Sequence, residues 1–236
     1  MFRNYLKVAF RNIRRNKLFS GINILGLAVG MACSIFILLW VQHERSYDKF
    51  HKNGADIYRF TAGLDKLEAC LSPAPLAKAM RQEMPEVKNT CILTPWGGLM
   101  QYGDRKFEEK EAFFADSTFL EFFSFPLIKG DKKTALSSPN NIVLTQSAAR
   151  KYFGNEEPIG KVMQMNNSAN FTVTGILADV PENSHLQFDM ILPLRFYANS
   201  NNDFIKNVWD NFNYYTYVQL SGIDSKAALQ NTVDKV

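Results

Sequence analysis

The stretch FGNEEPIGKV is the first place to look for chemistry, because two glycines followed by a lysine resemble a phosphate-binding loop. A Walker A loop needs four residues between its glycines and a Ser or Thr directly after the lysine, so that backbone amides wrap the phosphates and the hydroxyl binds magnesium. Here five residues separate Gly154 from Gly160, Val162 follows Lys161, and Pro158 lies inside the loop. We therefore expect structural turns at Gly154, Pro158 and Gly160, with no nucleotide site.

The histidines and the acidic pairs do not form a catalytic set either. His43, His51 and His185 lie in no zinc-binding pattern, and the first two are too far apart along a helix to share a metal. The pairs Glu108-Glu109 and Glu156-Glu157 fall in stretches that look like solvated turns, whereas catalytic carboxylates need burial to separate their pKa values. We expect that the chain is not an enzyme and holds no metal and no cofactor of its own.

The elements that position these residues follow one apolar segment near the N-terminus. From Phe19 to Val41, 23 residues pass without a charge. As a helix this segment would span about 34 Å, enough to cross a hydrocarbon core of about 30 Å. A cleaved signal peptide has a shorter apolar region that ends in small residues, whereas this one ends in IFILLWVQ. We expect an uncleaved transmembrane helix at residues 19–41; a cleaved signal and a buried soluble helix are the alternatives.

The charges around this segment predict its orientation. Six basic residues and no acidic residue precede it, and the rest of the chain carries a net charge of about −2. Basic flanks stay on the cytoplasmic side of a membrane. We therefore expect residues 1–18 in the cytoplasm and residues 42–236 in the periplasm. Nucleic acid is not an expected partner, because its binding needs cations spread over a folded face.

Residues 2–17 form an amphipathic helix if they are helical. One arc is apolar and aromatic, and the opposite arc carries Arg3, Lys7, Arg11, Arg14 and Arg15. A helix of this kind lies in the membrane interface, in contact with lipid. The alternative is a plain basic flank that only sets the topology.

A second pattern lies inside the apolar segment, where Gly26, Gly30 and Ser34 are spaced by four residues. Small residues at this spacing let a second membrane helix approach closely. We expect a helix-packing face here, although glycine is common enough in membrane helices for the spacing to arise by chance.

The remainder of the chain reads as short strands and helices. Residues 42–56 form a stalk whose helical character ends at Asn53-Gly54, and helix caps are expected at Ser72, Asp116 and Thr145. A hairpin is expected around Gly103-Asp104. Further strands are expected at residues 56–63, 86–94, 111–116, 141–145, 161–165, 171–180, 186–194 and 213–220, and helices at 73–84, 117–123, 146–153 and 223–236.

This order of elements predicts an α+β fold. The strand, helix and strand over residues 56–94 form a βαβ unit, and the last strand and helix begin a second, incomplete one. We expect a membrane-proximal βαβ-type subdomain built from residues 57–95 and 205–236, with a β-rich subdomain inserted at residues 96–204. Cys70 and Cys91 would face a compartment that permits a disulfide, and whether they pair stays open.

Several segments together resemble the MacB/FtsX-like permeases of ABC transporters, of the long variety common in Bacteroidota. The resemblance rests on LKVAFRNIRRNKLFSGINILGLAVGMA, ERSYDKFHKNGADIYRF, FFSFPLIKGD, IVLTQSAARKYFGNEEPIGKVM and FTVTGILADVPENSHLQFD, which follow one another in the order of the family.

This resemblance implies a permease subunit in the bacterial inner membrane that has one transmembrane helix before a periplasmic core domain. It further implies a partner ATPase that binds the ATP, additional permease helices, and a dimer of permeases. Motion of the ATPase would be transmitted mechanically to the periplasmic domain for export or release of a substrate. A membrane-anchored extracytoplasmic sensor or binding domain is the alternative, and a single-pass extracytoplasmic enzyme is a third reading.

Overall fold

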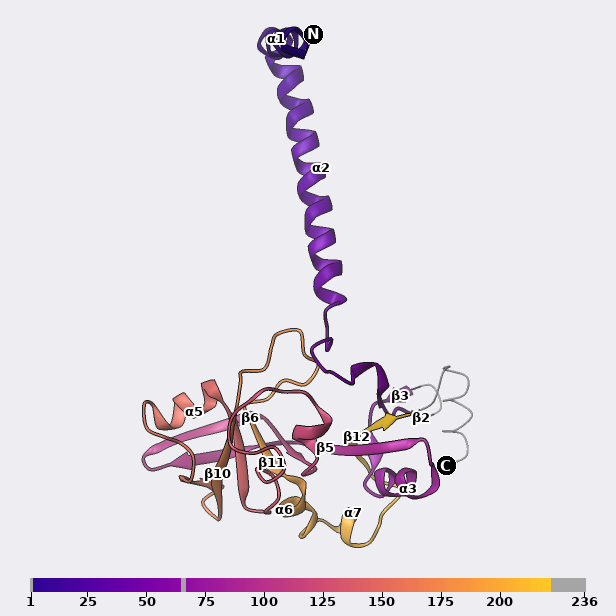
Figure 1. The fold of residues 1–236 in the computed structure, drawn as a ribbon, viewed down its shortest axis with the longest axis vertical. Coiled ribbons are helices and arrows are strands. Elements are labelled where there is room, and N and C mark those ends of the chain that lie inside the picture. The colour runs from indigo at the N-terminus through magenta and orange to yellow at the C-terminus, as the bar shows by residue number, and fades with distance from the viewer. Residues whose placement is uncertain (1, 65–66, 222–236) are drawn as a thin grey trace. The chain divides into compact units, whose positions relative to one another are not determined.

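The computed structural model describes residues 2–64 and 67–221 (Figure 1). The chain divides into two compact units, Met1–Tyr47 and Asp48–Val236, which are described separately. The helix expected at residues 223–236 lies outside the described residues.

The first unit consists of two helices. α1 covers Phe2–Arg15 and α2 covers Lys17–Glu44. Asn16 between them leaves the helical conformation, with φ −115° and ψ 58°. Among the described residues, α2 is the one helix that is long and apolar enough to cross a membrane. The transmembrane helix expected from the uncharged run therefore lies within a helix of 28 residues.

We expected helical character to continue from the apolar segment to Asn53, and this prediction is wrong. α2 ends at Glu44, and turns follow it. Asp48 has φ 57°, in the left-handed region, which no residue in the middle of an α-helix adopts. Its backbone N–H donates to Asn183 O at 2.9 Å instead of to the preceding turn.

The second unit, which we call the core domain, is a mixed sheet with short helices. Its strands are β1 Ile57–Arg59, β2 Ala62–Leu64, β3 Leu67–Ala69, β4 Ser72–Pro73, β5 Val87–Tyr102, β6 Arg105–Ala115, β7 Leu127–Lys129, β8 Asn141–Thr145, β9 Val162–Met165, β10 Ala169–Leu177, β11 Met190–Pro193 and β12 Phe212–Leu220. Its helices are the 3-10 turn η1 Gly54–Asp56 and α3 Leu76–Glu83, α4 Phe119–Phe122, α5 Gln146–Phe153, α6 Leu194–Ala198 and α7 Asn202–Ile205.

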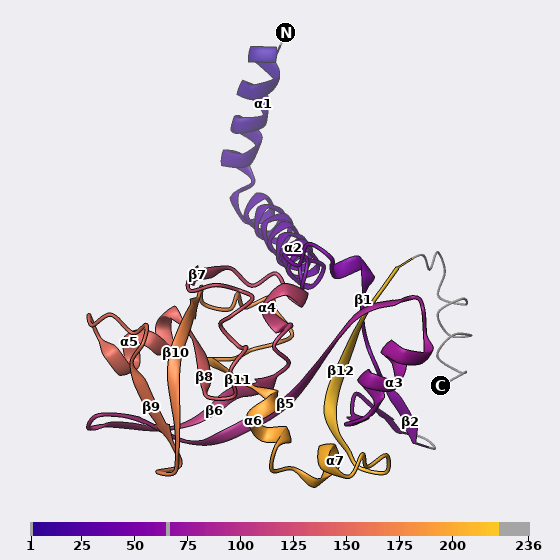
Figure 2. The same ribbon diagram turned by 60° about the horizontal axis from the view of Figure 1, so that its bottom comes forward.

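In the described residues, the main path of the sheet runs β1-β12-β5-β6-β11-β8-β10-β7, and β2 and β3 pair separately. β9 pairs with both β10 and β5, through Met165 opposite Met100. The strands β5, β6, β11, β8, β10 and β9 therefore close into a ring, and Figure 2 shows β9 and β10 running to the long β5-β6 hairpin. All six strands contribute residues to one hydrophobic cluster, including Met100, Phe114 and Phe171, which fills the ring.

A second cluster packs on the other face of the same strands. Ile142 and Leu144 of β8 belong to the first cluster while Val143 belongs to the second, as expected when side chains alternate across a strand. Around α4 the second cluster is dense in phenylalanine, and Phe119 and Phe125 stack with 5.7 Å between ring centroids. The α+β class predicted from the sequence is confirmed by this mixed sheet with helices.

Two of the predicted helix caps are wrong and one is confirmed. Ser72 and Pro73 form β4, where Ser72 Oγ donates to Tyr214 O at 3.0 Å, and α3 begins later, at Leu76. The carboxylate of Asp116 accepts from Ile92 N–H rather than capping α4. Thr145 does cap α5, since its hydroxyl accepts from Ala148 N–H at 3.2 Å.

The strands of the expected first βαβ unit do not lie side by side. β1 and β5 both pair antiparallel with β12, so β12 lies between them. β5 also continues past residue 95, the expected boundary of the inserted subdomain, and joins both regions in one sheet. The division into two subdomains stays a prediction.

One close approach in this sheet involves Gly130, directly after β7. Its φ is +96°, and a Cβ atom there would lie 2.4 Å from Thr174 O. Only glycine fits this position without a shift of the backbone.

Candidate functional site: the junction at the start of the core domain

The first residues of the core domain form hydrogen bonds and an ion pair that connect them to two loops and to the sheet. We call this set the junction and define it as Asp48, His51, Ser124, His185 and Tyr217. His185 N–H donates to Asp48 Oδ1 at 3.1 Å, and His185 Nδ1 lies 2.8 Å from Asp48 Oδ2. Because Asp48 N–H also donates to Asn183 O, this residue is held through both its backbone and its side chain.

His185 carries these contacts into the sheet. Its Nε2 lies 2.9 Å from the hydroxyl of Tyr217, which is 2% exposed and lies in β12. Burial raises the pKa of the Tyr217 hydroxyl, which therefore keeps its proton and can donate. A His185 ring with a proton on Nδ1 can donate to Asp48 while its Nε2 contacts the Tyr217 hydroxyl.

The second half of the junction surrounds His51, which is 7% exposed. Its Nδ1 accepts from Ser124 N–H at 3.1 Å, and Lys52 N–H donates to Ser124 Oγ at 2.9 Å. Burial lowers the pKa of His51; Asp48 opposes this shift, and His185 adds to it. His51 Nε2 is buried and has no hydrogen-bond partner among the described residues.

The segment FFSFP, which supplied part of the family resemblance, positions this half of the junction. Phe123 and Phe125 flank Ser124, and their ring centroids lie 5.3 Å and 5.1 Å from that of His51. Both phenylalanines are at most 1% exposed, so they fix the loop that presents Ser124. The junction was not predicted from the sequence. The aromatic segment FFSFP was the one feature that could have pointed to it, but no residue spacing near that segment indicates a contact with His51.

The residues predicted to pack against other membrane helices are exposed in this chain. A Cβ atom added at Gly26 or Gly30 would meet nothing within 4 Å, and Ser34 Oγ donates to Gly30 O at 2.9 Å. The helix-packing face therefore remains a prediction.

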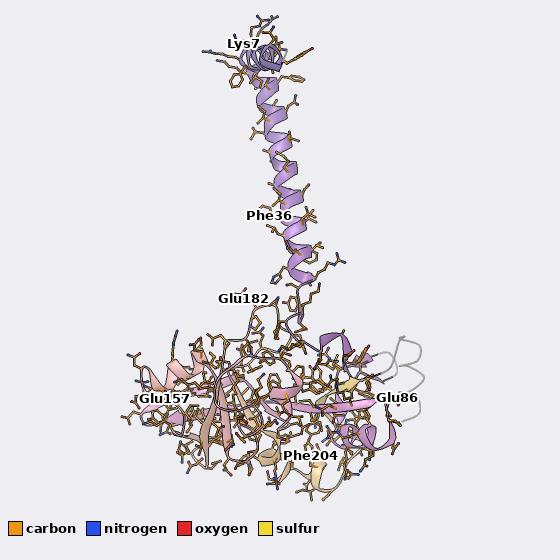
Figure 3. All side chains as sticks on the ribbon, viewed as in Figure 1. Lys7, Phe36, Glu86, Glu157, Glu182 and Phe204 are labelled. Atoms are coloured by element: carbon orange, nitrogen blue, oxygen red, sulfur yellow. The ribbon has the colours of Figure 1, made fainter. Side chains whose placement is uncertain are left out.

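The predicted basic face lies on α1. Among its five residues, Lys7, Arg11, Arg14 and Arg15 are exposed, and Figure 3 shows side chains projecting all around α1, with Lys7 labelled. A role of this face in the membrane interface stays a prediction.

The stretch that resembles a phosphate loop, residues 153–162, forms hydrogen bonds and an ion pair within the chain. Gly154 follows α5 with φ +64° and donates to Arg150 O, and Gly160 has φ +80° and donates to Val173 O. Lys161 lies 3.6 Å from Glu156 and is therefore paired. Pro158 O accepts from Lys161 N–H in the turn between the two glycines.

One expectation about the acidic pairs is wrong. Glu109 is 4% exposed, because β6 is a strand and this position points into the core. Its carboxylate accepts from Lys151 Nζ at 2.8 Å and 2.9 Å and from the Tyr152 hydroxyl. Glu156 and Glu157 are exposed, as expected. The buried charge of Glu109 is thus paired with Lys151 and hydrogen-bonded to Tyr152.

A cavity of about 300 Å³ lies between α3, α6 and α7. Its walls carry the apolar residues Ile92, Leu194 and Phe204 and the carboxyl of Asp116, whose pKa is raised by burial. The described residues that line it include no serine, threonine or cysteine. Among the described residues, no three His, Cys, Asp or Glu side chains gather to hold a metal, and Cys33, Cys70 and Cys91 are free thiols.

Comparisons with known proteins identify a family to which the chain is similar. The family model of the MacB-like periplasmic core domain matches residues 20–236, most of the chain. The chain belongs to this family of ABC transporter permease domains. No curated protein matches the chain.

Similar solved structures include domains of transporters and of a permease. A domain of a protein described as a permease from Porphyromonas gingivalis is similar with a TM-score of 0.67 and 25% identity, over 78% of this chain and 84% of that one. The periplasmic region of MacB from Actinobacillus actinomycetemcomitans has a TM-score of 0.56 and 17% identity, over 76% and 80% of the two chains. The extracellular domain of the noncanonic ABC-type transporter YknZ from Gram-positive bacteria has a TM-score of 0.53 and 15% identity, over 75% and 88%. The last two show the fold alone. The resemblance inferred from the sequence is confirmed.

Proposed function

We propose that this chain is part of the permease subunit of an ABC transporter in the bacterial inner membrane. In this proposal α2 spans the membrane, α1 lies on the cytoplasmic face and the core domain lies in the periplasm. The asymmetry of basic residues around the apolar run supports this orientation. ATP is bound by a partner ATPase, and further permease helices and a second permease copy complete the transporter.

The proposed mechanism is mechanical. ATP-driven motion of the ATPase is passed along α2, enters the core domain at Asp48 and acts there on the exported or released substrate. The observation that carries this proposal is the chain of contacts from Asp48 through His185 to Tyr217. It joins the first residue of the core domain to the middle of β12, which pairs with β1, β4 and β5. A displacement at Asp48 is thus delivered to strands and not to a loose loop.

Hydrogen exchange in the complete transporter tests this proposal. The permease and its ATPase are reconstituted in nanodiscs, and exchange is compared with and without a non-hydrolysable ATP analogue. In the wild type we expect the analogue to change exchange in the 178–189 loop and in β12. In the Asp48→Ala variant we expect this change to be lost while the ATPase still binds the analogue, because the contacts with His185 are gone.

Asp104→Ala is the matched control, since Asp104 is exposed in the β5-β6 turn and forms no ion pair with a described residue. It should respond as the wild type does. If the analogue leaves exchange in the wild-type core domain unchanged, or if Asp48→Ala responds fully, the mechanical proposal fails. A sensor or binding domain would show the first of these results.

The orientation is tested separately by labelling. Lys106 is exposed in β6, so Lys106→Cys in a Cys70→Ser background should react in intact cells whose outer membrane is permeabilised, with a reagent that cannot cross the inner membrane. Protection of this cysteine until the cells are lysed would place the core domain in the cytoplasm.

A further inference from the structure

The break between α1 and α2 forms a notch of about 440 Å³ within the first unit. Its apolar wall consists of Phe10, Ile13 and Ile24. On the α2 side the notch is lined by the small residues Ser20 and Gly21. A Cβ atom at Gly21 would meet nothing within 4 Å, so the notch is open at this point. A space of this size is large enough for a small-molecule ligand.

Two cations, Arg14 and Lys17, also line the notch. Both are exposed, and neither forms an ion pair with a described residue. The first acidic residue in the whole sequence is Glu44, at the far end of α2. The charge of this pair is therefore not neutralised by the first unit itself.

We propose that this notch is a binding site for an anionic phospholipid of the membrane leaflet that α1 lies on. The phosphate-bearing headgroup contacts Arg14 and Lys17, and the start of an acyl chain lies along Phe10, Ile13 and Ile24. This site rests on the proposed placement of α2 across the membrane. Because it combines Arg14 of α1 with Lys17 of α2, it is one position that distinguishes lipids by the charge of their headgroup.

The chemistry of the notch favours this ligand over a free anion. Phe10 is 73% exposed and Ile24 is 56% exposed, so the first unit leaves most of this apolar wall uncovered. A free phosphate would satisfy the cations and leave this wall bare, and a zwitterionic lipid would cover the wall and bring no net charge. An anionic phospholipid would neutralise the two cations and also cover the apolar wall.

Binding is measured with the full chain in detergent micelles, labelled at Lys106→Cys. Dioleoyl phosphatidylglycerol, dioleoyl phosphatidylcholine and inorganic phosphate are titrated, and binding is read by thermophoresis. We expect phosphatidylglycerol to bind well above phosphatidylcholine, and inorganic phosphate not to displace it. Each basic residue near an anionic lipid contributes a factor of about 5, so Arg14→Gln with Lys17→Gln should weaken phosphatidylglycerol binding about 25-fold.

The matched control is Lys7→Gln with Arg11→Gln, which also removes two positive charges, at positions of α1 that do not line the notch. It should weaken binding clearly less than Arg14→Gln with Lys17→Gln does, because its side chains lie outside the notch and act only through the diffuse charge of α1. Gly21→Phe is a neutral variant that fills the notch and keeps α2 apolar, and it should also abolish the preference for phosphatidylglycerol.

Equal losses of phosphatidylglycerol affinity in the two double variants would show that binding depends only on diffuse surface charge, which would contradict a specific site. Displacement by inorganic phosphate alone would show a free-anion site and overturn the lipid. Unchanged binding in Gly21→Phe would show that the notch is not the place. None of these results touches the exchange experiment on Asp48, so failure of this site and failure of the mechanical proposal are distinguishable.

Discussion

Replacing Asp48 by asparagine tests how much the junction contributes to stability. Asparagine has nearly the same size, and like aspartate it tolerates the left-handed φ of 57°. Its amide oxygen can still accept from His185 N–H, but its amide nitrogen cannot accept from His185 Nδ1–H. The change therefore removes one hydrogen bond to a charged acceptor and leaves the backbone as it is.

The expected loss follows from the geometry. Hydrogen bonds to charged groups contribute about 1.5–3 kcal/mol. The side chains of His185 and Asp48 are 31% and 32% exposed, so water screens the pair and the lower end applies. A loss of about 1.5 kcal/mol lowers the melting temperature of a domain of this size by about 3–6 °C. Asp48→Ala should fall further, by about 1–2 kcal/mol, because alanine is strained in the left-handed region.

The assay is thermal unfolding of the full chain in detergent at pH 7.5, followed by far-UV circular dichroism of the sheet. Asp104→Asn, in the exposed β5-β6 turn, is the control and should melt with the wild type. Melting of Asp48→Asn within about 1 °C of the wild type would refute the reasoning, because the contact with His185 Nδ1 would then contribute nothing measurable.

Three further predictions concern His51, Gly130 and Gly30. The pKa of His51 is lowered in the folded chain, so the unfolded chain binds more protons as the pH falls below about 6.5, and the free energy of unfolding should fall there by up to about 1.4 kcal/mol per pH unit. Urea unfolding between pH 7.5 and pH 5 should show this slope in the wild type and a flatter one in His51→Gln; equal slopes would assign the proton to another group. Gly130→Ala should lower the free energy of unfolding, measured from the urea midpoint, by about 3 kcal/mol, because the new Cβ meets Thr174 O. The control Gly103→Ala, at φ +56° with open space around it, should lose only about 1 kcal/mol. Similar losses in the two variants would contradict the role of the close approach. Gly30→Leu should leave α2 inserted but disrupt assembly of the complete transporter, measured as recovery of the permease–ATPase complex at matched membrane levels, and full recovery would remove the packing face.

Elements that depend on local signals could be predicted from the sequence. The uncharged run gave the core of α2, the Gly103-Asp104 turn gave the β5-β6 hairpin, and Thr145 gave the start of α5. In each case the determining residues are neighbours in the chain, and their effect on the backbone is the same in most contexts.

The junction could not be predicted in this way. Asp48 and His185 are 137 residues apart, and His185 and Tyr217 are 32 residues apart. Their pairing follows from how the sheet folds and not from any spacing. The same holds for the end of α2: SYDK is compatible with a helix, and the contacts of Asp48 with Asn183 and His185 are tertiary interactions that hold it in a different conformation.

Ring closure also decides what the core domain offers to its neighbours. In the described residues, the main path of the sheet ends at β1 and β7, so each of these two strands has a free edge. Each of these strands is three residues long and ends in an exposed cation, Arg59 in one and Lys129 in the other. Short, charged edges are poor templates for an added strand. Neither end of the sheet path therefore offers a good template for joining the sheet of a second copy.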